Sequence, residues 1–134
     1  MARTRLDGGA DVTWNVVDSR AEIIQELADA LNGENGRHYA TRQAAWHITN
    51  DAKEVRKLNH EHLRGYDASA DDLMHPHLDR IGQLLSDREF AASIPASHLG
   101  IMRAAVAAIR GALFSRASQH RQEVAQGQQR QATN

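Results

Sequence analysis

Apolar side chains recur every three or four positions along most of the chain, which is the spacing of helices that bury one side. Between residues 39 and 64 this spacing continues without interruption, so we expect one helix that ends at Gly65. A second long run begins near residues 95–97 and continues to about residue 125. The two apolar stripes comprise Ala44, Ala45, Ile48, Ala52, Val55, Leu58, Asn59 and His62 in the first helix, and Leu99, Met102, Val106, Ile109, Leu113, Ala117, His120 and Val124 in the second.

The N-terminal segment has a different spacing. Its run "DVTWNVVD" alternates apolar and polar side chains as a half-buried strand does, but no second run follows that could pair with it. We therefore expect residues 1–18 to form an extended arm packed on the body. Ser19 and Glu22 have the spacing of a capping box, which predicts that the first helix begins at Ser19 and ends at Asn32-Gly33. Its buried stripe is expected at Ile23, Leu27, Ala30 and Leu31.

Two shorter helices are expected between the long ones. Pro76 suits the first turn of a helix, where its missing amide costs nothing, so we expect a helix to begin there after a loop or a short turn over "DASADD". The run "SDRE" at residues 86–89 has the capping-box spacing and predicts a short helix that carries Phe90. The inward positions of the helix that begins at Pro76 are Leu78, Ile81, Leu84 and Leu85.

These elements predict an all-α fold, a four-helix-type bundle with an extended N-terminal arm and a long polar C-terminal helix or tail. The arm covers residues 1–18, the bundle domain residues 19–117, and the polar, Gln-rich helix end and tail residues 118–134. Thirty residues of helix would be about 45 Å long. A domain of this size has a radius of gyration of about 14 Å, so the last helix either frays or projects and meets a partner.

Composition excludes several classes of site. The chain has no cysteine, which excludes disulfides, thiolate zinc sites and a cysteine nucleophile, and fits a reducing compartment. No apolar run approaches the roughly 20 residues of a membrane span, and the first residues lack the apolar segment of a signal peptide. We therefore expect a cytoplasmic protein without a membrane partner.

Charge is unevenly distributed although the net charge is only −1. Residues 7–36 carry seven acids and one arginine, and residues 65–94 carry six acids and two arginines. Residues 37–64 carry six basic side chains and three acids, and residues 95–134 carry five arginines and one glutamate. This alternation fits neighbouring helices that complement one another, or a basic face for a polyanion on a nearly neutral molecule.

One side of the helix over residues 39–64 gathers cationic and aromatic side chains within an arc of about 100°. They are Tyr39, Arg42, Trp46, Thr49, Lys53, Arg56, Lys57, His60 and Arg64. Cations neutralise phosphates and rings stack on unpaired bases, so this face predicts a nucleic-acid or partner surface. The last helix adds Arg103, Arg110 and Arg121, and the two rows form a groove for a single strand if they adjoin. The alternative is a structural face, in which Trp46 is core and the cations pair with neighbouring acids.

Four histidines lie between residues 59 and 80, which raises the question of a metal site. His60 and His62 point about 200° apart on a helix, so they do not bind one ion together. The candidate set is His62, His75 and Asp79, which supply two nitrogens and one carboxylate if the chain brings them together. The simpler interpretation is that His62 is a hydrogen-bonded core histidine and His75 a helix cap.

The sequence favours a protein that acts through its surfaces. It has no phosphate-binding glycine loop, no nucleophile elbow and no HExxH, so we expect neither catalytic residues nor a cofactor. The leading hypothesis is a non-enzymatic subunit of a larger assembly, such as a phage or secretion component or a regulator, which binds a protein partner or itself. The alternative is a small nucleic-acid-binding subunit that grips phosphates through Arg42, Lys53, Arg56, Lys57 and Arg64.

Overall fold

The computed structural model describes residues 9–33 and 38–133, and the side chains of residues 12–33 and 38–129. All regular structure within these ranges is helical, so the predicted all-α class is confirmed. The elements in chain order are α1 (Gly9–Gly33), α2 (Tyr39–His60), the 3₁₀ helix η2 (Glu61–Arg64), α3 (Ala68–Ser86), α4 (Arg88–Ala92) and α5 (Ala96–Thr133).

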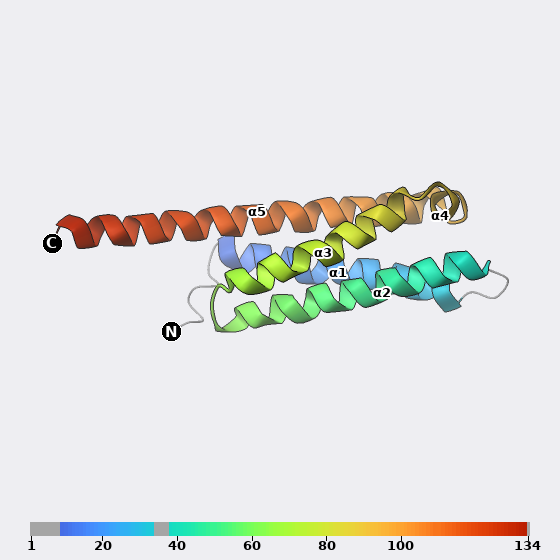
Figure 1. Ribbon diagram of the computed structural model, residues 1–134, viewed down its shortest axis with the longest axis horizontal. Coiled ribbons are helices and arrows are strands. Elements are labelled where there is room, and N and C mark those ends of the chain that lie inside the picture. The colour runs from blue at the N-terminus through green and yellow to red at the C-terminus, as the bar shows by residue number, and fades with distance from the viewer. Residues whose placement is uncertain (1–8, 34–37, 134) are drawn as a thin grey trace.

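The four long helices form an elongated bundle around one core (Figure 1). Helix α1 packs against α2 and α5, and α3 packs against the same two helices, so α2 and α5 stand at opposite corners. The core is aliphatic along most of its length, with one aromatic side chain from α4. Its largest members are Val17, Ile24, Leu31, Ile48, Val55, Met74, Leu78, Ile81, Leu85, Phe90, Met102 and Ile109.

The predicted extended arm is wrong from Gly9 onward, because helix α1 begins there. Residues 1–8 of the predicted arm lie outside the described residues. The alternation around Trp14 was misleading, since Val17 is buried and lies four positions before buried Ala21, which extends the helical spacing backward. Ser19 is therefore inside the helix and not its cap, and its hydroxyl donates to the Val16 carbonyl at 3.4 Å.

The buried stripe of α1 is also rotated by one position from the prediction. The fully buried side chains are those of Ile24 and Ala28, while Ile23 and Leu27 are half-buried and Ala30 is exposed. This rotation follows from the earlier start of the helix, because burial of Val17 and Ala21 sets the face that continues to Leu31. The predicted end at Asn32-Gly33 agrees with the observed end of α1.

Helix α3 begins at Ala68, eight positions before the predicted start at Pro76. Asp67 is its N-cap, and the Asp67 carboxylate accepts a hydrogen bond from the Ala70 amide at 3.1 Å. Buried Ala70, Met74 and Leu78 are spaced by four and carry the helix through the proline. The run "DASADD" is thus the cap and first turn of α3 and not a loop.

The remaining elements agree more closely with the sequence. Helix α2 and η2 together cover residues 39–64, and the chain turns at Gly65, whose φ of 131° favours glycine. The short helix α4 carries buried Phe90 as predicted, although Asp87 and not Ser86 is its cap. Helix α5 begins close to the predicted residues and continues past residue 125.

Helix α5 extends well beyond the other three long helices (Figure 1). Its 38 residues correspond to about 57 Å of helix. From Arg121 to Gln129 its side chains are exposed except for Gly127, which is half-buried. The polar C-terminal segment therefore continues α5 as a projecting helix end.

Candidate functional site

A buried ion pair joins α5 to α3 near one end of the bundle. Arg116 Nε donates to Asp71 Oδ2 at 3.0 Å, and Arg116 Nη2 donates to Asp71 Oδ1 at 2.5 Å. The Arg116 side chain is 5% exposed and the Asp71 side chain 6%. The third guanidinium nitrogen, Nη1, donates to Asn59 Oδ1 at 3.0 Å and so reaches α2. One arginine therefore connects three helices in a region closed to solvent.

Asn59 carries the network on to α1. Its Nδ2 donates to the Trp14 carbonyl at 3.1 Å, and the indole nitrogen of Trp14 donates to the Asn59 carbonyl at 2.9 Å. Asn59 is completely buried, so its amide needs these partners to offset its lost hydration. All four long helices are thereby joined through polar side chains at one level.

His62 completes the network and is a hydrogen-bonded core histidine, as the simpler interpretation held. Its Nδ1 accepts from the Asp67 amide at 3.1 Å, which places the proton of the neutral ring on Nε2. Nε2 lies 2.8 Å from Asp71 Oδ1. Burial alone would raise the pKa of Asp71, but hydrogen bonds from His62 and Arg116 and the charge of Arg116 hold that pKa below its ordinary value.

Tyr66 covers this network on the side of α5. Its ring stacks on His120 with a centroid distance of 4.4 Å and lies 5.3 Å from the ring of His62. Burial and the negative charge of Asp71 raise the pKa of Tyr66 above its ordinary value. The polar groups of this cluster bond to one another, so the cluster fastens the helices together.

A second buried carboxylate fastens α3 to α2. Asp51 Oδ1 lies 2.8 Å from His77 Nδ1 and accepts from Arg80 Nη2 at 2.8 Å, while Oδ2 accepts from Arg80 Nε at 2.8 Å. Burial raises the pKa of Asp51, but the hydrogen bonds and the charges of Arg80 and His77 outweigh it and lower that pKa. Asp51 lies outside the basic arc and holds α3 in place.

The three candidate metal ligands lie in separate environments. His62 lies in the buried network, and Asp79 accepts from Arg110 at 2.7 Å. His75 is exposed inside α3, so the expectation that it caps a helix is wrong, because α3 begins at Ala68 with Asp67 as its cap. Among the side chains that the structure describes, no group of three or more histidines and carboxylates has the arrangement of a metal site.

The N-terminal half of the basic face on α2 is open to solvent. Tyr39 is 66% exposed and Trp46 is 52% exposed, so Trp46 is not core. Arg42 lies between them, with its guanidinium carbon 5.9 Å from the centroid of the Tyr39 ring. These three side chains, with Asn32 and Gln43, line a recess of about 260 Å³.

Farther along α2 the face is shared with α1. Arg56 donates to Asp18 at 3.4 Å and to Gln25 at 3.3 Å, and Thr49, which the sequence placed outward, is buried. The ring of His60 lies edge-on to Trp14 at 5.4 Å, and His60 Nε2 is 3.7 Å from Asp18. The exposed members of the arc are Tyr39, Arg42, Trp46, Lys53, Lys57, His60 and Arg64.

The second basic row does not adjoin the first. Helices α2 and α5 occupy opposite corners of the bundle, and two of the α5 arginines turn toward α3. Arg103 donates to the Leu85 carbonyl at 2.9 Å, and Arg110 pairs with Asp79. The groove that the sequence suggested between the two rows is therefore not formed within one chain.

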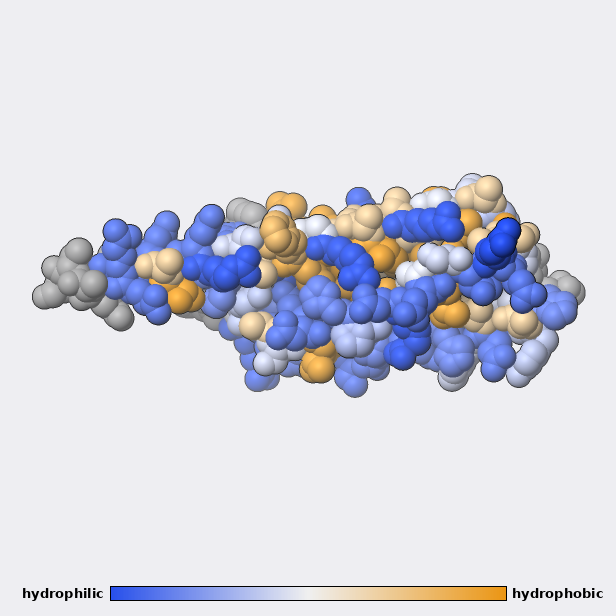
Figure 2. All heavy atoms as spheres, turned by 45° about the horizontal axis from the view of Figure 1, so that its top comes forward, coloured by the Kyte–Doolittle hydropathy of each residue, from blue (hydrophilic) through white to orange (hydrophobic). Residues whose placement is uncertain are grey.

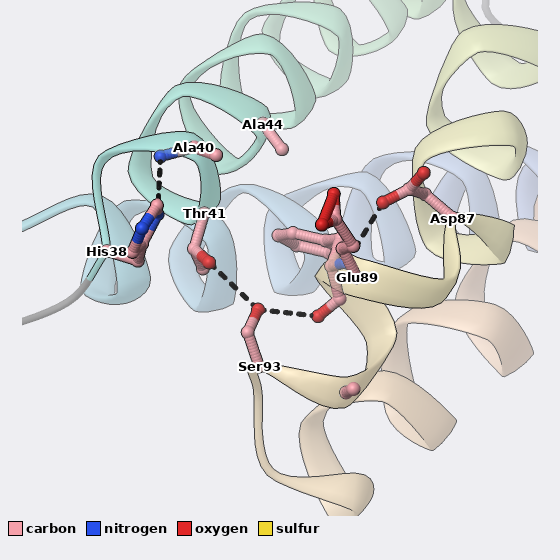
Figure 3. A pocket seen from close by; sticks show the side chains of 9 residues that line it. His38, Ala40, Thr41, Ala44, Asp87, Glu89 and Ser93 are labelled. Carbon is pink, nitrogen blue, oxygen red and sulfur yellow. Dashed lines mark hydrogen bonds between the residues drawn. The ribbon is translucent and has the colours of Figure 1, made fainter.

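A surface pocket of about 500 Å³ lies between the start of α2 and helix α4 (Figure 3). Thr41 donates to the Ser93 hydroxyl at 2.9 Å, and that hydroxyl donates to the Phe90 carbonyl at 2.7 Å. Asp87 caps α4 by accepting from the Phe90 amide at 3.0 Å, and His38 caps α2. These groups are used to hold helix ends, and the sequence analysis did not find this pocket.

Helix α5 presents an apolar side to solvent, opposite the side that joins the core. Phe114 is 71% exposed and Ile101 is 47% exposed. Figure 2 shows orange and tan apolar surface along the top of the molecule, over α5, with blue hydrophilic side chains beside it. We call the following residues the outer face of α5: Ser97, Gly100, Ile101, Ala104, Ala107, Ala108, Gly111, Phe114, Ser115 and Ser118.

Comparison with protein-family models, with curated proteins and with solved structures found no match to the chain. Within the described residues, no helix combines the length and the apolar character that crossing a membrane requires. The surfaces of the bundle itself are therefore the features that indicate a function.

Proposed function

We propose that the protein is a non-enzymatic helical subunit that binds another protein through α5. The observation that carries this proposal is the outer face of α5, which has no charged residue among its ten members. Helices on the surface of a soluble protein normally present charged side chains to water. A helix that is apolar on two opposite sides is typical of one that is covered on both.

The large apolar side chains on this face are stronger evidence for a bound partner than the small ones are. Exposed Phe114 contributes a ring that water solvates poorly, and aromatic side chains are enriched at the centres of protein interfaces. The projecting end of α5 adds a second contact region, because a helix end that packs on nothing has no tertiary support for its length. Both features belong to one helix and favour a partner that lies along it.

The proposal is tested in a clarified extract of the native host by native gel filtration of the untagged protein. We expect the wild type to elute in a complex larger than its own 14.9 kDa, and Phe114→Asp to shift it toward the mass of the free chain. Leu73→Asp is the matched control, because Leu73 is 58% exposed on α3, outside the outer face of α5. Elution of the wild type at the mass of a free chain contradicts the proposal.

Nucleic-acid binding is the second candidate function. The specific observation that favours it is the exposed pair Tyr39 and Trp46 with Arg42 between them, followed along α2 by exposed Lys53 and Lys57. Rings of this kind stack on bases while the cations neutralise phosphates.

A fluorescent single strand, titrated at two salt concentrations, tests this second candidate. Binding should weaken as salt increases, because bound phosphates release counterions. The double variant Lys53→Glu/Lys57→Glu should weaken it further, whereas Glu123→Gln on the projecting end serves as a control with a similar exposure. Absence of binding at the lower salt concentration removes the candidate.

A further inference from the structure

The outer face of α5 has a nearly symmetric order of side-chain sizes. About a point midway between Ala107 and Ala108, Gly100 corresponds to Ser115, Ile101 to Phe114, and Ala104 to Gly111. Small residues thus occupy the centre and one large apolar residue stands toward each end. A two-fold axis through this point pairs these positions, since residue i of one copy meets residue j of the other, and j meets i.

Packing within a single chain does not require glycine at positions 100 and 111 of this face. Gly100 and Gly111 are exposed and lie inside a helix, where glycine costs about 1 kcal/mol relative to alanine. A Cβ atom added at either position would meet nothing within 4 Å. Close approach of another backbone explains the choice of glycine, because a side chain at these positions would hold that backbone away.

Resting on the proposed function, we propose that the partner on the outer face of α5 is a second copy of this chain. The two α5 helices run antiparallel about a two-fold axis that passes between Ala107 and Ala108. In this arrangement Ala104 of one copy faces Gly111 of the other, where two larger side chains would collide. Ile101 of one copy comes level with Phe114 of the other, so each end of the interface contains large apolar groups.

The central part of the outer face carries no charge. Of the basic residues beside it, Arg110 pairs with Asp79 on α3, Arg103 bonds to the Leu85 carbonyl, and Arg121 donates to Ser118 at one end of the face. Arg116 is buried on the opposite side of the helix. Two copies can therefore meet along the centre of the face, from Gly100 to Ser115, without a charged side chain of that face in the contact.

The oligomeric state of the purified protein gives the first test. Sedimentation equilibrium across a range of concentrations should report about twice the 14.9 kDa of one chain, with reversible dissociation on dilution. Gly111→Glu should increase the dissociation constant of the dimer by about 30-fold or more, as for a residue central to an interface. Gly82→Glu is the matched control, since Gly82 lies on α3 and also has open space around it, and it should leave the dimer intact.

Disulfide trapping tests the orientation, because the chain has no cysteine of its own. Gly100→Cys and Ser115→Cys proteins should form a mixed disulfide when they are combined and oxidised, and neither should cross-link alone. Cross-linking of each variant with itself would indicate parallel helices and would overturn the antiparallel dimer. A wild type that stays monomeric at all concentrations would also overturn it.

The two proposals fail separately. If the purified protein is monomeric but Phe114→Asp still releases it from a complex in the host extract, the outer face binds a different protein and the second copy is excluded. If the host complex is absent as well, the proposed function fails with it. Helical content measured by circular dichroism confirms that each variant is folded.

Discussion

Arg116 on α5 and Asp71 on α3 are joined by two hydrogen bonds in a place where both side chains are at most 6% exposed. A buried ion pair of this kind is weak evidence for stability, because desolvation offsets much of its attraction. Replacing only one of the two residues is costly, since the charge of the other is then buried without a partner. The pair therefore fixes how the helices are arranged more than it adds to the free energy of unfolding.

Arg116→Met is expected to lower the free energy of unfolding by about 3–5 kcal/mol, because Asp71 is left charged and buried. Urea denaturation measures the change. The double variant Arg116→Met/Asp71→Leu should be more stable than Arg116→Met alone, since no orphan charge remains. A double variant that is less stable than the single one would show that burial of the carboxylate is not the main cost.

Stability should decrease as the pH falls into the acid range. The pKa values of Asp51 and Asp71 are lower in the folded state than the ordinary value of 3.8, so the unfolded chain binds more protons there. The contribution of these carboxylates is fully present above the unfolded pKa and is lost as pH falls through the folded pKa. Urea unfolding at a series of pH values down to about 2 checks this. Replacement of Asp51 by asparagine should flatten the dependence, while Asp72→Asn, on the exposed side of α3, should change it little.

Pro76→Ala should raise the melting temperature. Proline inside a helix removes one backbone hydrogen bond and costs up to about 3 kcal/mol relative to alanine, and part of that cost is recovered because proline also restricts the unfolded chain. A net gain of about 1–2 kcal/mol corresponds to an increase of several degrees in a domain of this size. Calorimetry measures it. A lower melting temperature would mean that proline itself is needed at position 76 for α3 to pack.

The two tryptophans should differ in their access to solvent. Trp14 is half-buried and bonded to Asn59, whereas Trp46 is 52% exposed. Fluorescence of the Trp14→Phe variant, which reports Trp46 alone, should therefore be quenched strongly by iodide. The Trp46→Phe variant should be quenched several-fold less, and its free energy of unfolding should change by no more than about 0.5 kcal/mol. Equal quenching of the two would contradict the exposed position of Trp46.

Helix α2 was predictable because its buried residues keep one period from Ala45 to Asn59, and Gly65 marks the stop. Helix α1 was not, because a short alternating run around Trp14 fits a strand as well as one edge of a helix. The start of α3 was misplaced because proline is common in first turns, while the cap at Asp67 is a single acid with no second signal.

Only part of the buried network could be predicted from the sequence. Asn59 and His62 lie on an apolar stripe, and a polar group there needs a partner in the core. The residue type of Arg116 gave no such signal, since a buried arginine and a surface arginine look alike in a sequence. Arg116 lies three positions after Leu113 and four before His120, on the inner side of α5, and that spacing could have identified it.

The polar network has a mechanical consequence for the far end of α5. Arg116 is clamped to α2 and α3, and Thr133 lies 17 residues further along the same continuous helix, or about 26 Å away. Because α5 is continuous and is held at Arg116, any tilt of the helix there displaces its C-terminal end by a larger distance. The tip is thus held in a set direction, and a change in packing around Arg116 would move it.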